Sequence, residues 1–362
     1  MPQIIIQPLN CVTMSYKTTR NCLKCSILAL GLLVLQVATA QDGFADLDQA
    51  LSAKQKQLGK SYVLQVWKAG DTLAYLKTSP ELNARTAVPV AGSSKWLTAA
   101  LLMVFVDEGK ISLDDKITRW LPEFEKYGKN YITLRHCLSH MTGIKSDGSG
   151  VGKLFQKKKF DSLEEEVNSY AAREIQSNPG TEFRYNDIGP NIAGRVLEVL
   201  TKKRFDQLAK QRLFTPMKMR STSFSNMGGG PLDPSGGASA SADDYMKFLV
   251  MLLNKGTYHG RRILSEESVA ELLKAQVPAG LMKDVPKLTE GYSYALGSWV
   301  ANTGAAGTVF TGPAFPGAWP MIDTCRGYAY VYMVKDSPGE EKTRLHMELK
   351  STVDGHFSGN CD

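Results

Sequence analysis

A lysine stands near the start of an apolar segment, where a serine–lysine pair could perform acyl transfer. The segment is VPVAGSSKWLTAA, residues 88–100, and the lysine is Lys95. Residues three apart on a helix share a face, so a serine at position 92 would set its hydroxyl beside the amine. That serine could attack an acyl carbon while the amine, its pKa lowered by its neighbours, helps to withdraw the proton. Position 92 is Gly92, so the nucleophile of this pair is missing.

The two serines that follow Gly92 do not replace the missing hydroxyl. Ser93 lies two residues from Lys95 and Ser94 is adjacent to it, and neither spacing brings the two side chains onto one helix face. We expect Gly92 to be the N-cap of the helix, a position that glycine occupies at little cost relative to serine. The helix N-terminus could still offer a backbone N–H to a developing oxyanion.

Two other patterns resemble ligand sites but lack residues that such sites need. HCLSH places His136 and His140 one helical turn apart, which could hold zinc, but neither a general-base glutamate nor a third acidic ligand is obvious nearby. GSGVGK, residues 148–153, lacks the first glycine and the final hydroxyl residue of a phosphate-binding loop. We expect no metal and no cofactor.

The elements that must position Lys95 come from both ends of the chain. Residues 61–79 contain two β-rich runs around a Gly-Asp turn, which predicts a hairpin. Residues 95–109 are apolar on nearly all faces, typical of a centrally buried helix. Strand-like segments return from about residue 292, with a turn near Arg326. The economical α/β (α+β) fold joins both sets of strands in one antiparallel sheet, flanked by helices, with a helical subdomain in the middle.

The middle of the chain is mainly helical. Its clearest helix is SADDYMKFLVMLLNKG, residues 241–256, with Ser241 as N-cap, Asp244 completing a capping box and Gly256 as the stop signal. The expected organisation is one domain, residues 41–362, in which residues 41–109 and about 276–362 form the sheet region and about 110–275 the helical region.

The first forty residues are typical of a secretory signal peptide. Basic residues precede the apolar run SILALGLLVLQV, residues 26–37, and Ala-Thr-Ala follows it. A run of about twelve apolar residues is too short to span a bilayer. We therefore expect cleavage near Ala40, no stable membrane span afterwards, and a periplasmic or secreted protein.

Charge and cysteine content constrain the partners. Removal of residues 1–40 leaves 40 basic against 36 acidic residues, a thin surplus whose one cluster is Lys157–Lys159. We therefore expect no nucleic-acid partner.

The cysteines that remain, Cys137, Cys325 and Cys361, are too few for a disulfide framework, although one Cys325–Cys361 bridge could form after export.

Four segments, taken in order, resemble the serine β-lactamase and penicillin-binding-protein superfamily, specifically its class C β-lactamase and esterase branch. The similarity extends from about residue 61 to 335. Its markers are AGSSKWLTAALLMVFVDEGKISLDD (91–115), ITLRHCLSHMTGI (132–144), PGTEFRYNDIGPNIAGRVLE (179–198) and SADDYMKFLVMLLNKG (241–256). The resemblance implies a β-lactamase/transpeptidase-like fold and hydrolysis of an ester, an amide or a peptidoglycan-like peptide by a serine.

The resemblance also implies a second catalytic element, Tyr-x-Asn, in which the tyrosine shuttles protons and the amide contacts the substrate. Tyr185 matches the tyrosine, and Asp187 stands where the family usually has asparagine. A carboxylate at this position would favour a charged lysine and would repel anionic substrates. Carboxylate-bearing β-lactams are therefore doubtful ligands.

A third implied element is a Lys-Thr-Gly or His-x-Gly strand whose edge supplies a second oxyanion N–H. The candidate is VFTGPAFPGAW, residues 309–319. If Phe310-Thr311-Gly312 is the motif, the next residue is Pro313, which has no N–H to donate. If Gly312-Pro313-Ala314 is the motif, Phe315 follows and can donate, and we prefer this register. The expected substrate-binding residues are Asp187, Gly312, Ala314 and Phe315.

Two functions from different classes follow. The chain is either an exported serine hydrolase with an altered nucleophile position, or a catalytically silent pseudoenzyme whose pocket binds a cell-wall peptide or ester. In both cases the partner is a small molecule or a peptide, and Lys95, Tyr185 and the Gly92 backbone should meet in one pocket.

Overall fold

The computed structural model describes residues 42–69, 72–146, 160–225, 230–301, 309–314, 317–335, 342–357 and 361. The chain divides into residues 1–45 and 46–362, and the description below concerns the second part. The expected signal peptide, residues 148–153, Lys157–Lys159 and Phe315 lie outside the described residues. Within the described residues, none of the helices is both long and apolar enough to cross a membrane.

A seven-stranded antiparallel sheet carries the fold, in the order β10-β11-β12-β13-β14-β1-β2. Its strands are β1 (Tyr62–Lys68), β2 (Thr72–Thr78), β10 (Ser293–Tyr294), β11 (Trp299–Ala301), β12 (Val309–Thr311), β13 (Ala318–Asp323) and β14 (Tyr328–Val334). β1 pairs with β14 along its full length, from Tyr62 opposite Val334 to Lys68 opposite Tyr328. The predicted hairpin and its union with the late strands are thus confirmed.

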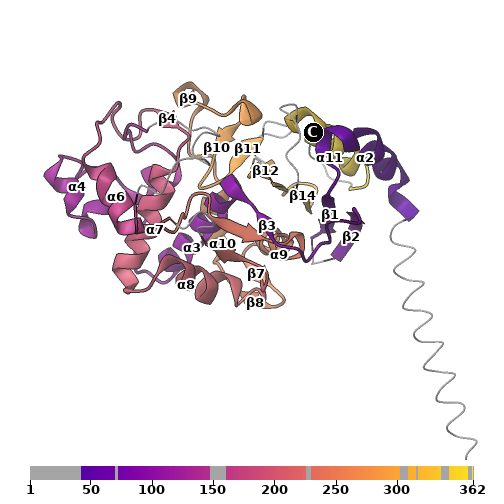
Figure 1. The fold of residues 1–362 in the computed structure, drawn as a ribbon, viewed down its shortest axis with the longest axis horizontal. Coiled ribbons are helices and arrows are strands. Elements are labelled where there is room, and N and C mark those ends of the chain that lie inside the picture. The colour runs from indigo at the N-terminus through magenta and orange to yellow at the C-terminus, as the bar shows by residue number, and fades with distance from the viewer. Residues whose placement is uncertain are drawn as a thin grey trace, which may run out of the picture. The chain divides into compact units, whose positions relative to one another are not determined.

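Alternate residues of β14 face opposite layers, because successive side chains of a strand point to opposite sides of a sheet. Ala329, Val331 and Met333 belong to the main core, where α9 (Ala242–Leu253) packs on the sheet. Tyr330 and Tyr332 instead contact His346 of α11 (Lys342–Asp354). Figure 1 shows α11 and α2 (Ala45–Leu58) on one side of the sheet and α9 on the other. Both faces are covered, so every residue of β14 is buried.

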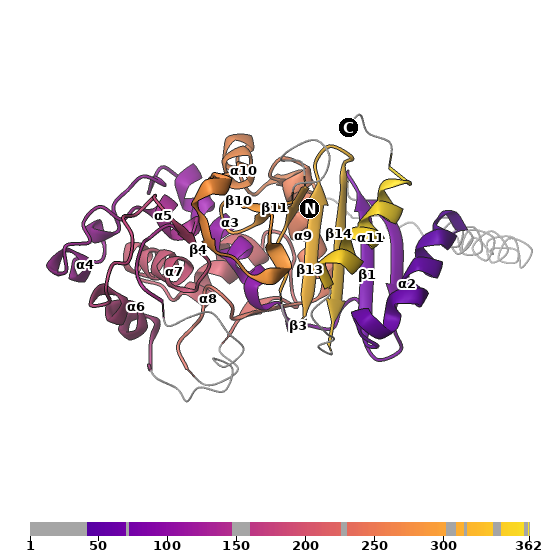
Figure 2. The ribbon, with the colours of Figure 1, turned by 90° about the horizontal axis from the view of Figure 1, so that it is seen from above.

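The remaining helices come mostly from the middle of the chain, and Figure 2 shows α4, α5, α6, α7 and α8 gathered away from β1 and β2. They are η2 (Ala91–Ser93), α3 (Ser94–Asp107), η3 (Ile117–Arg119), α4 (Glu123–Lys126), α5 (Leu134–Leu138), α6 (Leu163–Ala171), α7 (Ile188–Thr201), α8 (Phe205–Ala209), η5 (Lys210–Phe214), α10 (Glu266–Leu273), η6 (Ala279–Leu281) and η7 (Lys287–Thr289), with η1 (Asp42–Phe44) in the first part of the chain. Short sheets connect them: β3 (Val88–Pro89) with β6 (Ala238–Ala240) and β5 (Ser223–Phe224), β4 (Phe183–Arg184) with β9 (Met282–Asp284), and β7 (Thr257–Tyr258) with β8 (Arg261–Arg262).

Helix α9 follows its sequence signals except for one side chain. The Ser241 hydroxyl accepts from the Asp244 backbone N–H at 3.2 Å, as an N-cap should. After the helix, Gly256 adopts a positive φ of 89°. The Asp244 carboxylate does not complete the expected capping box. It accepts instead from the Ser221 backbone N–H at 2.6 Å and pairs with Lys247, so a tertiary contact replaces the local one.

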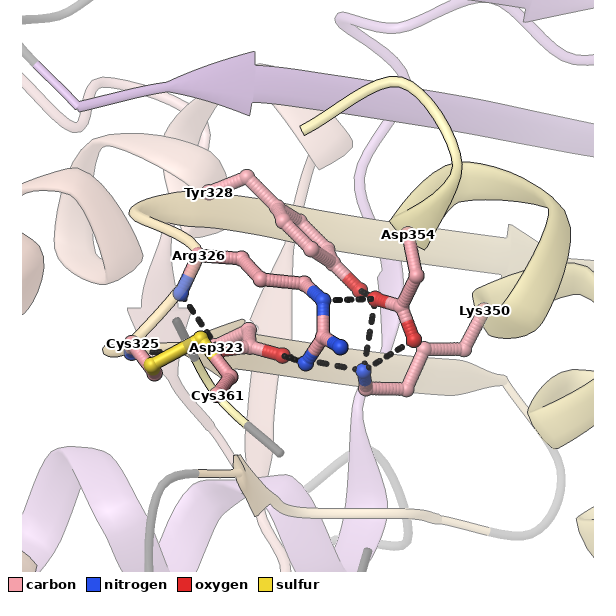
Figure 3. Close-up of a disulfide and its surroundings, with 7 residues drawn as sticks. All are labelled: Asp323, Cys325, Arg326, Tyr328, Lys350, Asp354 and Cys361. Carbon is pink, nitrogen blue, oxygen red and sulfur yellow. Dashed lines mark hydrogen bonds and ion pairs between the residues drawn. A yellow bond between two sulfur atoms is a disulfide. The ribbon is translucent and has the colours of Figure 1, made fainter. Parts of the chain in front are cut away.

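Cys325 and Cys361, the pair that the sequence left open, form a disulfide with their Cα atoms 5.8 Å apart and a sequence separation of 36. The bridge holds the chain after α11 against the turn between β13 and β14. Figure 3 shows a charged cluster beside it, in which the Lys350 ammonium lies between Asp323 and Asp354. Cys137 is free and buried.

Candidate active site

The turn that contains Gly92 lies between β3 and α3. Antiparallel pairing of β3 with β6 fixes its start, and the Val90 backbone N–H donates to the Ala238 carbonyl at 2.9 Å. Ala91 has a positive φ of 38°, an uncommon conformation that this pairing maintains. Gly92 lies inside the short helix η2, and the N-cap of α3 is Ser93, which corrects the expectation of a Gly92 N-cap.

Lys95 is buried one turn further along, with 3% of its side chain exposed. Its Nζ donates to Asp187 Oδ1 and to the Ser235 backbone carbonyl, both at 3.1 Å. The same Nζ lies 4.7 Å from the centre of the Tyr185 ring. The structure therefore brings Lys95, Tyr185 and Asp187 together from α3 and from the segment between β4 and α7.

The Tyr185 hydroxyl lies where the side chain of a serine at position 92 would begin. A Cβ atom added to Gly92 would be 2.9 Å from this hydroxyl oxygen and 3.6 Å from the Pro313 carbonyl. Contacts that close are below normal van der Waals separation, so any side chain at position 92 requires Tyr185 to shift. Three predicted site residues, Gly92, Lys95 and Tyr185, thus converge on one place.

The neighbouring serines are engaged elsewhere. Ser93 and Ser94 are fully buried. The Ser93 hydroxyl donates to the Gly312 carbonyl, and the Ser94 hydroxyl accepts from the Ala238 N–H at 3.0 Å. Neither hydroxyl is placed to take over the role of a nucleophile at position 92.

The segment after β12 packs against the Gly92 turn, but two of its N–H groups are already bonded. Gly312 N–H donates to the Pro320 carbonyl at 3.2 Å, and Ala314 N–H donates to the Ala318 carbonyl at 2.8 Å. Neither N–H is therefore free for an oxyanion in this state. A substrate-binding role for Gly312 and Ala314 stays a prediction, as does the role of Phe315, which lies outside the described residues.

An aromatic cluster that sequence reasoning missed supports Tyr185. The Tyr185 backbone N–H donates to the Asp284 carbonyl of β9 at 3.0 Å. Its ring centre lies 4.6 Å from that of His140 and 5.2 Å from that of Trp299. His140 Nδ1 accepts from the Asn186 N–H at 3.4 Å, and Nε2 lies 3.1 Å from the Tyr294 hydroxyl. His140 thus positions Tyr185 through packing.

His136 and His140 do not share a site. His136 Nδ1 accepts from the Thr133 backbone N–H at 3.3 Å, in the capping box of α5. In the described ranges, no three histidine, cysteine or acidic side chains gather in an arrangement that could hold a metal ion.

A loop between β5 and β6 contributes a second set of residues that were not predicted. Ser235 supplies the carbonyl that accepts from Lys95, and Asn191 Oδ1 of α7 accepts from the Ser235 N–H at 3.0 Å. Asp233 Oδ1 accepts from the Ser235 hydroxyl at 2.6 Å. The run GGGPLDPSGG just before the 241–256 helix was the signal for this loop, but nothing in it indicated a contact with Lys95.

Charge at the site keeps Lys95 protonated. Burial by itself lowers the pKa of Lys95, but Tyr185, Asp187 and Asp233 outweigh it and raise that pKa. Burial also raises the pKa of Tyr185. The charged lysine that Asp187 was expected to favour is what the structure indicates, whereas the lowered pKa expected of a serine–lysine pair is not: at neutral pH the site holds an ammonium and a neutral phenol, and neither is a ready base.

His140 should make the protein less stable in acid. Burial first, then Lys95, holds the pKa of His140 well below its usual 6.5. Below about pH 6.5 the unfolded chain binds a proton that the folded chain does not, so the free energy of unfolding should fall by about 1.4 kcal/mol per pH unit from this group. Urea unfolding between pH 5 and 7 measures the slope.

The free energy of unfolding should depend less steeply on pH in the variant His140→Gln than in the unmodified protein. His136, whose pKa burial also lowers, should leave part of the slope in place. His259→Gln, at an exposed histidine, is the matched control and should keep the full slope. Equal slopes for all three proteins would contradict a buried, neutral His140.

Comparisons with known proteins agree with this architecture. A solved structure of a candidate β-lactamase from Bacteroides dorei matches with a TM-score of 0.74 and 26% identity, over 86% of this chain and 98% of that one. A D-stereospecific amidohydrolase from Streptomyces matches with a TM-score of 0.66 and 20% identity, over 84% and 98%. The second likeness concerns the fold alone.

Among protein sequences, Protein flp of Staphylococcus aureus is 24% identical over 169 residues, which is 46% of this chain and 33% of that protein. The match thus spans about a third of the length of this relative. The β-lactamase family model matches residues 47–352, which include Gly92, Lys95, Tyr185 and Asp187. This chain therefore belongs to the β-lactamase family.

Proposed function

We propose that this chain binds an ester, an amide or a cell-wall peptide in a β-lactamase-type pocket without forming an acyl-enzyme. Acyl transfer through the enzyme needs a nucleophilic side chain. Gly92 supplies none, and the Tyr185 hydroxyl lies only 2.9 Å from the place that a Cβ atom at position 92 would take. This one observation supports the ligand-binding alternative over the hydrolase.

The rest of the pocket is suited to binding. Lys95 is held by Asp187 and Ser235. Tyr185 is a neutral phenol next to Gly92, and its hydroxyl can donate to the carbonyl oxygen of a ligand. Because α3 and η2 begin at this point, the dipole of the helix favours the same oxygen. An acyl group could therefore bind and persist.

Slow hydrolysis by water is the second candidate, and the retained Lys95, Tyr185 and Asp187 favour it. A site that has lost its nucleophile can still exceed the uncatalysed rate by about 10³-fold. Here, however, a water molecule would need a base, and both Lys95 and Tyr185 hold their protons at neutral pH. Binding is therefore the better supported function.

Export belongs to the proposal. The N-terminal pattern is that of a signal peptide cleaved near Ala40. The Cys325–Cys361 bridge is a second, independent support, since disulfides persist mainly in oxidising compartments. We place the protein in the periplasm or outside the cell, and within the family we assign it to the class C and esterase branch.

The unmodified protein should bind without being labelled. Incubated with a fluorophosphonate or a labelled penicillin, it is expected to show no covalent adduct by intact mass, and no burst with a p-nitrophenyl ester. Short esters and alanyl peptides should nevertheless raise its thermal midpoint, because a ligand of the folded state stabilises it. An adduct on Ser93 or Ser94 would overturn the proposal. So would a failure of every ligand in such a panel to bind.

A further inference from the structure

The two side chains of the ion pair between Lys95 and Asp187 differ in their exposure to solvent. The Lys95 side chain is 3% exposed and the Asp187 side chain is 38% exposed, although Nζ and Oδ1 are only 3.1 Å apart. The cation is therefore enclosed and the carboxylate is accessible. A ligand that enters the site meets negative charge before it meets positive charge.

A second acidic side chain, Asp233, lies beside this pair, and burial and then Asp187 raise its pKa. Asp233 lies half-buried in the loop that bonds Lys95, and it accepts from the Ser235 hydroxyl and N–H at 2.6 and 2.9 Å. The electrostatic influence of Asp233 reaches both Lys95 and Asp187. His140, which also senses Lys95 and Asp187, is neutral at pH 7 and adds no positive charge.

We propose, resting on the ligand-binding function above, that Asp187 makes this pocket select ligands that carry an amine close to the bound carbonyl group, and reject ligands that carry a carboxylate there. A ligand ammonium can donate to the exposed side of Asp187 while Lys95 keeps its bond to Oδ1. Hydrogen bonds between charged groups are stronger than neutral ones. Asp187 would repel a ligand carboxylate at the same place, and that carboxylate could not pair with Lys95 because the lysine is enclosed.

Three matched ligands test the selectivity. Alanine p-nitroanilide with a free amine, its N-acetyl form and its N-succinyl form carry positive, zero and negative charge, and both enantiomers of each are used. Calorimetry on the unmodified protein should show the free amine binding about five- to tenfold more tightly than the N-acetyl form, the size expected for a partly exposed charge pair. The N-succinyl form should bind most weakly.

Variants assign the selectivity to Asp187. Asp187→Asn should bring the three affinities within about twofold of one another, whereas Asp187→Glu should keep the order. Asp206→Asn, which removes a carboxylate that pairs with Arg204 on α8, is the control and should change nothing. In the unmodified protein, added salt should reduce the preference for the free amine over the N-acetyl form, because salt screens the attraction between the ligand ammonium and Asp187. This measurement needs no variant to fold.

The outcomes separate the two proposals. If no form of the ligand binds, the proposed ligand-binding function fails, and the selectivity with it. If all three forms bind equally, or the N-succinyl form binds best, the pocket binds acyl ligands but Asp187 does not select amines. A preference for the amine that persists unchanged in Asp187→Asn would likewise overturn the role given to Asp187.

Discussion

The variant Gly92→Ser is expected to become labelled at position 92 by a fluorophosphonate and to hydrolyse a short p-nitrophenyl ester at least ~100-fold faster than the unmodified protein. The new hydroxyl would lie three residues before Lys95 and beside the Tyr185 hydroxyl, and it would supply the nucleophile that Gly92 lacks. Because Lys95 and Tyr185 hold their protons at neutral pH, the rate should increase with pH. Intact-mass analysis and ester kinetics measure the two effects. Labelling by a penicillin should be weaker, because Asp187 opposes a ligand carboxylate.

The cost to folding should be small. The Cβ of the new serine would be 2.9 Å from the Tyr185 hydroxyl, so that hydroxyl must shift, but it is the far end of a side chain and not part of the backbone. Replacing glycine also restricts the unfolded chain, which favours folding. We expect the free energy of unfolding to change by less than about 1 kcal/mol.

Gly92→Ala is the matched control, because it adds the same Cβ without the hydroxyl. It should match the serine variant in stability and show neither labelling nor ester hydrolysis. A folded Gly92→Ser protein that stays inert would mean that the pocket no longer aligns a nucleophile with Lys95 and Tyr185. In that case the binding role would stand, but the proposed geometry of acyl transfer would not.

The sequence predicted most of the fold because its signals are local and strong. Residues 95–105 are apolar on every side, and α3 is buried along this whole stretch. Ser241 begins α9 through a hydrogen bond to its hydroxyl, and Gly256 follows the end of the helix with a positive φ. The Asp244 side chain escaped prediction because its partner, Ser221, is distant in sequence and its position depends on the completed fold.

The sequence motifs predicted part of the site, and contacts between distant segments account for the part that they missed. The order and spacing of the motifs indicated that Gly92, Lys95 and Tyr185 would meet. The bond from Lys95 to the Ser235 carbonyl could not be foreseen, because every residue carries a carbonyl and none marks its partner. The pKa of Lys95 depends on Tyr185, Asp187 and Asp233; Asp187 already indicated a charged lysine, but spacing along α3 could not reveal the contribution of Asp233 from a separate segment.

Far from this site, Lys350→Ala is expected to lower the free energy of unfolding by about 3 kcal/mol, the lower end of the cost of breaking a buried ion pair, because Asp323 keeps a second cation, Arg326, at 3.4 Å. Lys350 is 2% exposed, and its Nζ lies 2.9 Å from Asp323 Oδ2, whose side chain is fully buried. Asp323 keeps N–H donors from Cys325 and Arg326, at 3.1 and 2.8 Å. These donors should hold the loss near the lower end of the range for buried pairs.

The matched control is Lys54→Ala, which breaks a pair between α2 and the same helix α11. Lys54 lies 2.9 Å from Glu348, but their side chains are 22% and 39% exposed, so water replaces the lost partner and the cost should stay below about 1 kcal/mol. Urea unfolding compares the variants with the Cys325–Cys361 bridge intact, so that its effect on the unfolded chain is common to all. The double variant Asp323→Asn/Lys350→Met should be more stable than Lys350→Met alone, since it also removes a buried carboxylate whose remaining ion-pair partner is the partly exposed Arg326. Equal losses from Lys350→Ala and Lys54→Ala would show that Asp323 does not depend on its buried lysine.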